Sequence, residues 1–157
     1  MQISKIAGVL ALAVVLIAGC GQGSETENQT ETDGDTKKEQ ELTDFEMLNG
    51  VGPVDEEITI EEVDEELAKE GMKIFDMKCG ACHKMDNRYV GPPLGSVMNT
   101  RTPAFVMNMI LNPDGMLQKH PIAQSLQAEY ITPMPDQQLS REDARAVVEY
   151  LVQESQQ

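Results

Sequence analysis

Cys79-Gly80-Ala81-Cys82-His83 is the stretch of sequence from which the fold can be read. Two thiols separated by two small residues can reach the two vinyl groups of one haem as thioethers, and the next residue places an imidazole beside the iron. A thioredoxin-like redox pair would need a βαβ context, and half of a zinc site would need a further pair of soft ligands. The other cysteine is Cys20 and the other histidine is His120, so the sequence does not supply that pair. The motif therefore predicts one covalently bound haem c, with His83 as an iron ligand.

The composition agrees with a small domain built around a cofactor. A chain of 157 residues supports at most one sizeable core, and aromatic residues make up only 4% of it. Few large rings are available to fill that core, so a bound haem would supply the missing bulk. The formal net charge of −15 argues against a nucleic-acid partner, because the chain could not neutralise phosphates.

The first 19 residues have the pattern of an export signal. Lys5 is their only charge, and residues 6–18 form an apolar run of the length expected for the hydrophobic part of a signal peptide. The run ends in Leu16-Ile17-Ala18-Gly19-Cys20, which resembles the lipobox of bacterial lipoproteins. That resemblance implies lipidation of Cys20 and a protein anchored to a membrane of the bacterial cell envelope, with its haem domain in the periplasm or another extracytoplasmic space. An ordinary cleaved signal is the alternative.

Residues 20–64 are predicted to be an acidic membrane tether. Residues 21–66 contain 17 Asp or Glu against Lys37 and Lys38, whereas residues 67–157 contain 10 acidic and 9 basic residues. As far as about Glu41 the segment has no apolar periodicity and cannot bury enough surface to fold, so we expect a disordered chain there. Apolar residues return between Phe45 and Val63, which indicates that the later part packs on the folded domain.

Helical signals dominate residues 65–157, which we expect to form one all-α domain of about four to five helices. Residues 65–77 carry an apolar stripe with helical spacing. Thr102-Pro103 predicts a helix start whose helix stops at Asn112-Pro113, and Pro121 predicts another helix to about residue 129. Ser140 begins a capping box ahead of a last helix with one apolar face.

These elements resemble the class I c-type cytochromes, and the resemblance covers residues 67–153. That family has a first helix with a glycine and an aromatic residue ahead of the haem-binding motif, a Gly-Pro-x-Leu loop, a methionine beside a proline, and a last helix that crosses the first. The matching residues here are Gly71, Phe75, Gly91-Pro92-Pro93-Leu94, Met134-Pro135, Val147 and Tyr150-Leu151. The resemblance implies a small cytochrome c fold around one haem, with Gly71 meeting the last helix near Tyr150.

The same resemblance implies roles for residues around the haem. Cys79 and Cys82 would form the thioethers, and the carbonyl of Pro92 would orient the ring of the proximal ligand His83. Leu94 belongs to the loop that contacts the haem. Arg101 is the candidate for neutralising a haem propionate, with Arg88 as the alternative.

The sixth ligand has to be chosen among several methionines. Met134 is favoured because Pro133 and Pro135 flank it, fix the backbone and keep the segment extended. Met98, Met107, Met109 and Met116 also follow the haem-binding motif, and Met116 is the second choice among them. A methionine on a helix is more often core filler. His120 is a further alternative, although a histidine beside a proline at a helix start is expected at the surface.

An iron with His83 and Met134 on its two faces has no position left for a substrate, so it can only gain or lose an electron. The sequence therefore predicts an electron carrier, not an enzyme, that exchanges electrons with donor and acceptor proteins of a respiratory chain. Residues 89–92 and 108–113 resemble cytochromes that accompany respiratory reductases, including nitrous oxide reductases, and a terminal oxidase is an equal candidate. Two interpretations remain open: a haem with a labile sixth position that senses small ligands or reduces peroxide, and a fixed electron-entry subunit of a reductase.

Overall fold

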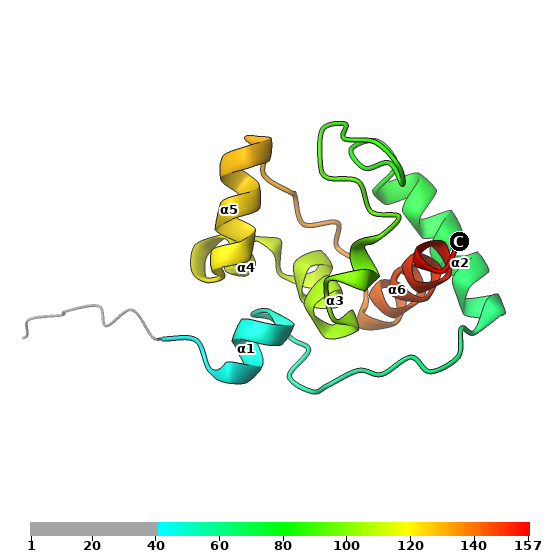
Figure 1. Ribbon diagram of the computed structural model, residues 1–157, viewed down its shortest axis with the longest axis horizontal. Helices are drawn as coiled ribbons and strands as arrows, with labels where there is room; N and C mark the ends of the chain where they lie inside the picture. The colour runs from blue at the N-terminus through cyan, green and yellow to red at the C-terminus, as the bar shows by residue number, and fades with distance from the viewer. Residues whose placement is uncertain (1–40) are drawn as a thin grey trace, which may run out of the picture. The chain divides into compact units, whose positions relative to one another are not determined.

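The computed structural model describes residues 41–157. Within this range the chain forms α-helices, one short 3-10 helix and no strand, so the predicted all-α fold is confirmed (Figure 1). In chain order the helices are α1 (Asp44–Asn49), α2 (Glu65–Lys78), the 3-10 helix η1 (Val97–Asn99), α3 (Pro103–Leu111), α4 (Pro113–Lys119), α5 (Pro121–Tyr130) and α6 (Arg141–Ser155). The short helices α1 and α4 are additional to those predicted. The signal segment and Cys20 lie outside the described residues.

Local capping signals explain where the predicted helices begin. The Thr102 hydroxyl accepts a hydrogen bond from the Phe105 N–H at 3.1 Å, and proline occupies the first position of α3. At α6, Ser140 and Asp143 form a capping box in which each side chain accepts the other's backbone N–H. Pro113 ends α3 as predicted, but it also begins α4 at once, because proline is compatible with a first helical turn.

Helices α2 and α6 make the most extensive contact between helices and cross at Gly71 (Figure 1). A Cβ atom at Gly71 would overlap the carbonyl oxygen of Ala146 and approach the backbone nitrogen of Val147 to 2.9 Å, so only glycine permits this approach. One turn further along, the rings of Phe75 and Tyr150 meet edge to face with centroids 5.6 Å apart. The crossing predicted from the family resemblance is therefore present, centred on Ala146 and Val147, one turn before Tyr150.

Tyr150 also has a perturbed hydroxyl. Its pKa is raised above the usual value, first by burial and then by the carboxylates of Glu154 and Asp76. The neutral phenol is therefore the form that the folded protein favours.

Residues 49–54, which we call the strap, connect α1 to the domain through Asn108 of α3. The Asn108 side chain is fully buried, and its Oδ1 accepts the Val54 N–H at 2.9 Å. Its Nδ2 donates to the carbonyls of Asn49 and Val54, each at 2.9 Å. Asn112 adds a bond of 3.0 Å to the carbonyl of Val51. One buried amide thus satisfies three backbone groups between the end of α1 and Val54.

His120 does not lie at the surface, and that expectation was wrong. The residue is completely buried between α4 and α5, where its ring meets the Phe105 ring edge to face. Its Nδ1 accepts the Ile122 N–H at 3.2 Å and so caps α5, and its Nε2 lies 3.2 Å from the Met47 carbonyl. Helix α1, which the sequence did not predict, supplies the cover and the hydrogen-bond acceptor that make this burial favourable.

In residues 41–157, no helix has both the length and the apolar character needed to cross a membrane.

Candidate functional site: an apolar cavity with a thiol pair and an imidazole

The C-terminal end of α2 presents the two cysteines. The backbone N–H of Cys79 bonds to Phe75 O, and the Cys79 carbonyl accepts the N–H groups of Cys82 and His83 at 2.9 Å each. This tight turn brings both thiols and the imidazole to the end of one helix. Burial, followed by repulsion from Cys82, raises the pKa of the Cys79 thiol to about 11. Before haem attachment, Cys79 therefore favours the neutral thiol.

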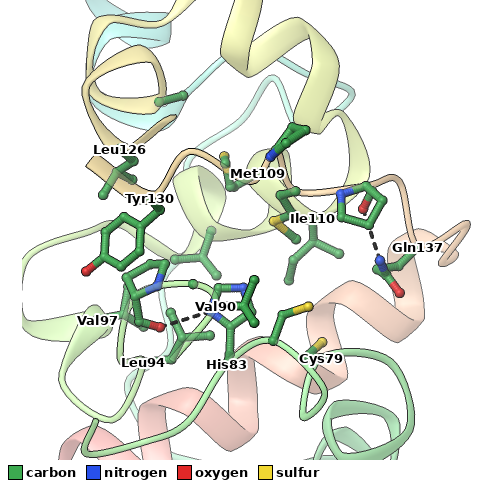
Figure 2. Close-up of a pocket in the computed structure, with 18 of the residues that line it drawn as sticks. Cys79, His83, Val90, Leu94, Val97, Met109, Ile110, Leu126, Tyr130 and Gln137 are labelled. Atoms are coloured by element: carbon green, nitrogen blue, oxygen red, sulfur yellow. Dashed lines mark hydrogen bonds between the residues drawn. The ribbon is translucent and has the colours of Figure 1, made fainter. Parts of the chain in front are cut away.

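The following loop fixes the orientation of His83. The Nδ1 atom of His83 lies 2.9 Å from the carbonyl oxygen of Pro92, the acceptor that the family resemblance assigns (Figure 2). With Nδ1 engaged there, Nε2 is the nitrogen available to a metal. Gly91 gives the ring its space, because a Cβ at this position would come within 2.5 Å of Cε1 and 2.9 Å of Nδ1 of His83.

These groups face a large cavity of about 1180 Å³, a volume that includes its open mouth. An apolar cleft that opens to solvent on one side and carries a few convergent polar groups is typical of a site for a large, mostly apolar cofactor. In Figure 2, Cys79, His83 and Leu94 lie on one side of the space, and Leu126 and Met109 on the other. The lining is mostly apolar and includes Phe75, Cys79, Cys82, His83, Pro92, Leu94, Arg101, Met109, Tyr130, Met134, Val147 and Leu151.

Two methionines line the cavity. Met134 reaches it from the segment between α5 and α6, and Met109 reaches it from α3. Met116, the second choice from the sequence, is fully buried, and its sulfur accepts the Val51 N–H at 3.0 Å. Neither Met116 nor His120 is a lining residue of the cavity. Met109 was among the methionines left as candidates from the sequence, but it was ranked below Met134 and Met116 because its helical position looked like core packing.

The Met134 segment leaves α5 through a sharp turn at Ile131. Ile131 has φ 63° and ψ −48°, and the Thr132 N–H donates to the Tyr130 carbonyl at 2.6 Å. These values describe a γ-turn of the rare, strained type, here on a β-branched residue. Beyond it, Gln137 donates from Nε2 to the Pro135 carbonyl at 3.0 Å, a contact drawn in Figure 2.

The two arginine candidates occupy different places. Arg101 lines the cavity, donates to the Thr100 carbonyl at 3.0 Å and has its guanidinium 5.4 Å from the centre of the Phe105 ring. Arg88 is not a lining residue and forms an ion pair with Glu129 at 2.7 Å. Arg101 is therefore the one of the two that can meet an anionic group at the cavity.

The residues present fit a haem. Two thiols and an imidazole with one occupied nitrogen stand on one wall of an apolar space, and a glycine leaves room for that imidazole. A soft thioether and a guanidinium also line the space, and they suit an iron and a carboxylate respectively.

The comparison with protein families agrees with this geometry. The family model described as cytochrome c matches residues 68–155. This chain belongs to the cytochrome c family. Members of this family hold haem c covalently, exchange electrons with redox partners and are typically electron carriers.

Solved structures resemble this cytochrome closely. The cytochrome c from Rhodothermus marinus is 42% identical with a TM-score of 0.67, and the match covers 71% of this chain and 96% of that chain. An engineered form of that protein, Rma TDE, is 41% identical with a TM-score of 0.68, covering 71% and 97%. The same engineered protein bound to a carbene intermediate is 40% identical with a TM-score of 0.65, covering 71% and 97%. No curated protein matches the chain.

Proposed function

We propose that this cytochrome carries single electrons between respiratory proteins of the cell envelope, with His83 and Met134 as the axial ligands of one haem. The observation that carries the proposal is the cavity itself, which is lined by the thiol pair, the His83 imidazole and the Met134 thioether. A haem with His and Met ligands supplies a one-electron couple of relatively high potential.

The residues around the site have roles that suit electron transfer. Pro92 holds the His83 ring in one orientation through Nδ1. Met134 is presented by a segment with proline on either side, so the thioether needs little reordering between oxidation states. The apolar lining excludes water, and Arg101 is placed to neutralise a propionate. With both axial positions supplied by the chain, no position is left for a substrate.

The proposal includes a lipid anchor at Cys20, on the strength of the lipobox-like sequence before it. An anchored carrier would exchange electrons with partners near the same membrane, such as a terminal oxidase or a reductase of the nitrous oxide type. Interfaces of this kind are small and transient. Labelling with a fatty acid, followed by intact-mass analysis of native and Cys20→Ser protein, tests the anchor. Masses that differ only by the exchange of sulfur for oxygen, with no label in the native protein, would contradict it.

Spectroscopy of the haem-loaded full chain tests the ligand set. Ferric haem with a methionine thioether shows a weak charge-transfer band at the red end of the visible spectrum, and we expect this band in the native protein. Met134→Ala should abolish it, whereas Met109→Leu and Met116→Leu should keep it. Loss of the band in either control variant, with its retention in Met134→Ala, would assign the ligand elsewhere.

Carbon monoxide separates the carrier from a sensor or a peroxidase. A carrier with Met134 on the iron binds carbon monoxide slowly, because the thioether must leave first. The position of His120 supports the carrier, since the histidine that could serve peroxide chemistry does not line the cavity. Rapid binding by the reduced native protein would favour the sensor.

A further inference from the structure

Arg88 connects two segments of this cytochrome that are distant in sequence. It lies in the loop between His83 and Gly91, and its guanidinium reaches the C-terminal end of α5. One nitrogen pairs with the Glu129 carboxylate at 2.7 Å, and another donates to the Glu129 carbonyl at 2.8 Å. The guanidinium carbon lies 4.1 Å from the centre of the Tyr130 ring. A single planar group therefore makes an ion pair, a hydrogen bond and a cation–π contact.

The residues that Arg88 holds lead directly to Met134. Tyr130 is the last residue of α5 and lines the cavity, and the strained turn at Ile131 follows it. Thr132, Pro133 and Met134 then form part of the cavity lining. The Glu129 carbonyl is one of the last carbonyls of the helix, which lack partners within the helix and are favourably met by a cation. Arg88 thus fixes the end of the helix from which the Met134 segment starts.

We propose that Arg88 is a positioning residue for the sixth ligand, which it holds by tying the loop after His83 to the start of the Met134 segment. This inference rests on the proposed ligation by Met134. When the tie is released, the end of α5 gains freedom at Ile131, and the thioether leaves the iron more often. Arg88 therefore sets how readily an external ligand enters.

A plain positive charge would not replace this arrangement. An exposed ion pair contributes little by itself. The guanidinium adds a second donor in a fixed plane and a flat face against Tyr130, which a lysine ammonium cannot reproduce together. We therefore expect Arg88→Lys to be intermediate between the native protein and Arg88→Gln.

Arg141 supplies a matched control. It also pairs with a glutamate, Glu56 at 2.6 Å, and also donates to a backbone carbonyl, that of Pro53 at 3.4 Å. The side-chain exposures are 54% and 55% for Arg88 and Glu129, and 42% and 69% for Arg141 and Glu56, so the two pairs are comparably hydrated. Arg141 does not line the cavity that contains Met134.

The test measures imidazole binding to the ferric, haem-loaded full chain above neutral pH. Imidazole is then neutral, so removing the positive charge of Arg88 does not change the electrostatic attraction of imidazole to the site. At high imidazole concentration the binding rate approaches the rate at which the thioether leaves. Arg88→Gln should raise this limiting rate about tenfold, equivalent to about 1.4 kcal/mol. Arg141→Gln should change it less than about twofold, and the two variants should unfold at similar temperatures.

The comparison of Arg88→Gln with Arg141→Gln separates a role in holding Met134 from a general effect of losing an ion pair. A limiting rate for Arg88→Gln within twofold of that for Arg141→Gln would overturn the proposal, as would a rise matched by a correspondingly larger loss of thermal stability. If Arg88→Gln does not yield haem-loaded protein, Arg88→Lys decides alone, and an unchanged rate overturns the proposal. Absence of the methionine band in the native protein would overturn the proposed ligation as well, and is thereby distinguished from a failure of the Arg88 inference alone.

Discussion

Replacement of Gly71 by alanine tests whether the close crossing of α2 and α6 holds the domain together. The new Cβ would overlap the Ala146 carbonyl oxygen and lie 2.9 Å from the Val147 nitrogen. Both atoms belong to the backbone of a helix, so neither can turn aside as a side chain would. The two helices must therefore separate along a contact that also includes Phe75 and Tyr150.

Two opposing contributions determine how much stability Gly71→Ala loses. Alanine favours the helix over glycine by about 1 kcal/mol. Overpacking a core costs typically about 1–3 kcal/mol, and we expect the upper end because rigid backbone is met. The net loss of stability is about 2 kcal/mol. For a domain of this size that lowers the midpoint of thermal unfolding by roughly 6–10 °C.

Thermal unfolding of the haem-loaded protein, followed by circular dichroism, is the assay. Glu70→Ala, an exposed position in the same helix, is the control and should change the midpoint by no more than a few degrees. If Gly71→Ala were as stable as the native protein, helix propensity would outweigh the crossing and our account of the contact would be refuted.

Three further substitutions probe the site, the titration of Tyr150 and the strap. Gly91→Ala should push the His83 ring off the Pro92 carbonyl and lower the yield of low-spin haem protein, and an unaltered spectrum at full yield would contradict this. Because burial raises the pKa of Tyr150, the folded protein loses stability as the pH rises from the ordinary tyrosine value of about 10 through the folded value. Tyr150→Phe should remove this loss of stability at alkaline pH, and NMR of the tyrosine rings should show directly that Tyr150 ionises at a higher pH than an ordinary tyrosine. Asn108→Ala leaves buried backbone groups of the strap without partners and should cost about 2–4 kcal/mol in urea unfolding, whereas a loss below 1 kcal/mol would mean that water replaces the amide.

The parts of the fold that could be predicted are those governed by neighbours in sequence. The capping residues Thr102 and Ser140 act within one helical turn, so their helices begin where predicted. The glycine in the middle of the helix indicated a close approach by another helix, because glycine otherwise weakens a helix. The family resemblance then identified the last helix as the partner at Gly71. The Cys79 to His83 motif likewise contains its geometry within one turn.

The parts that could not be predicted depend on partners far along the chain. His120 is buried because Met47, 73 residues away, supplies an acceptor. From the sequence, Asn108 looks like an ordinary polar residue of a helix. Its role depends on the strap, where its partner Val54 lies 54 residues earlier in the chain. The same holds for Arg88, whose partner Glu129 is 41 residues distant, and for Met109, whose helical position does not indicate that it faces the cavity.

The strap has a mechanical consequence if the protein is anchored through Cys20 as we propose. A force transmitted along the backbone from that side reaches the Asn108 hydrogen bonds and the buried Val54 before it reaches α2. Under tension α1 and the strap would detach first, while the α2–α6 pair and the cavity stayed intact. The hydrogen bonds between Asn108 and the strap thus protect the cavity from a pulling force on the N-terminal side.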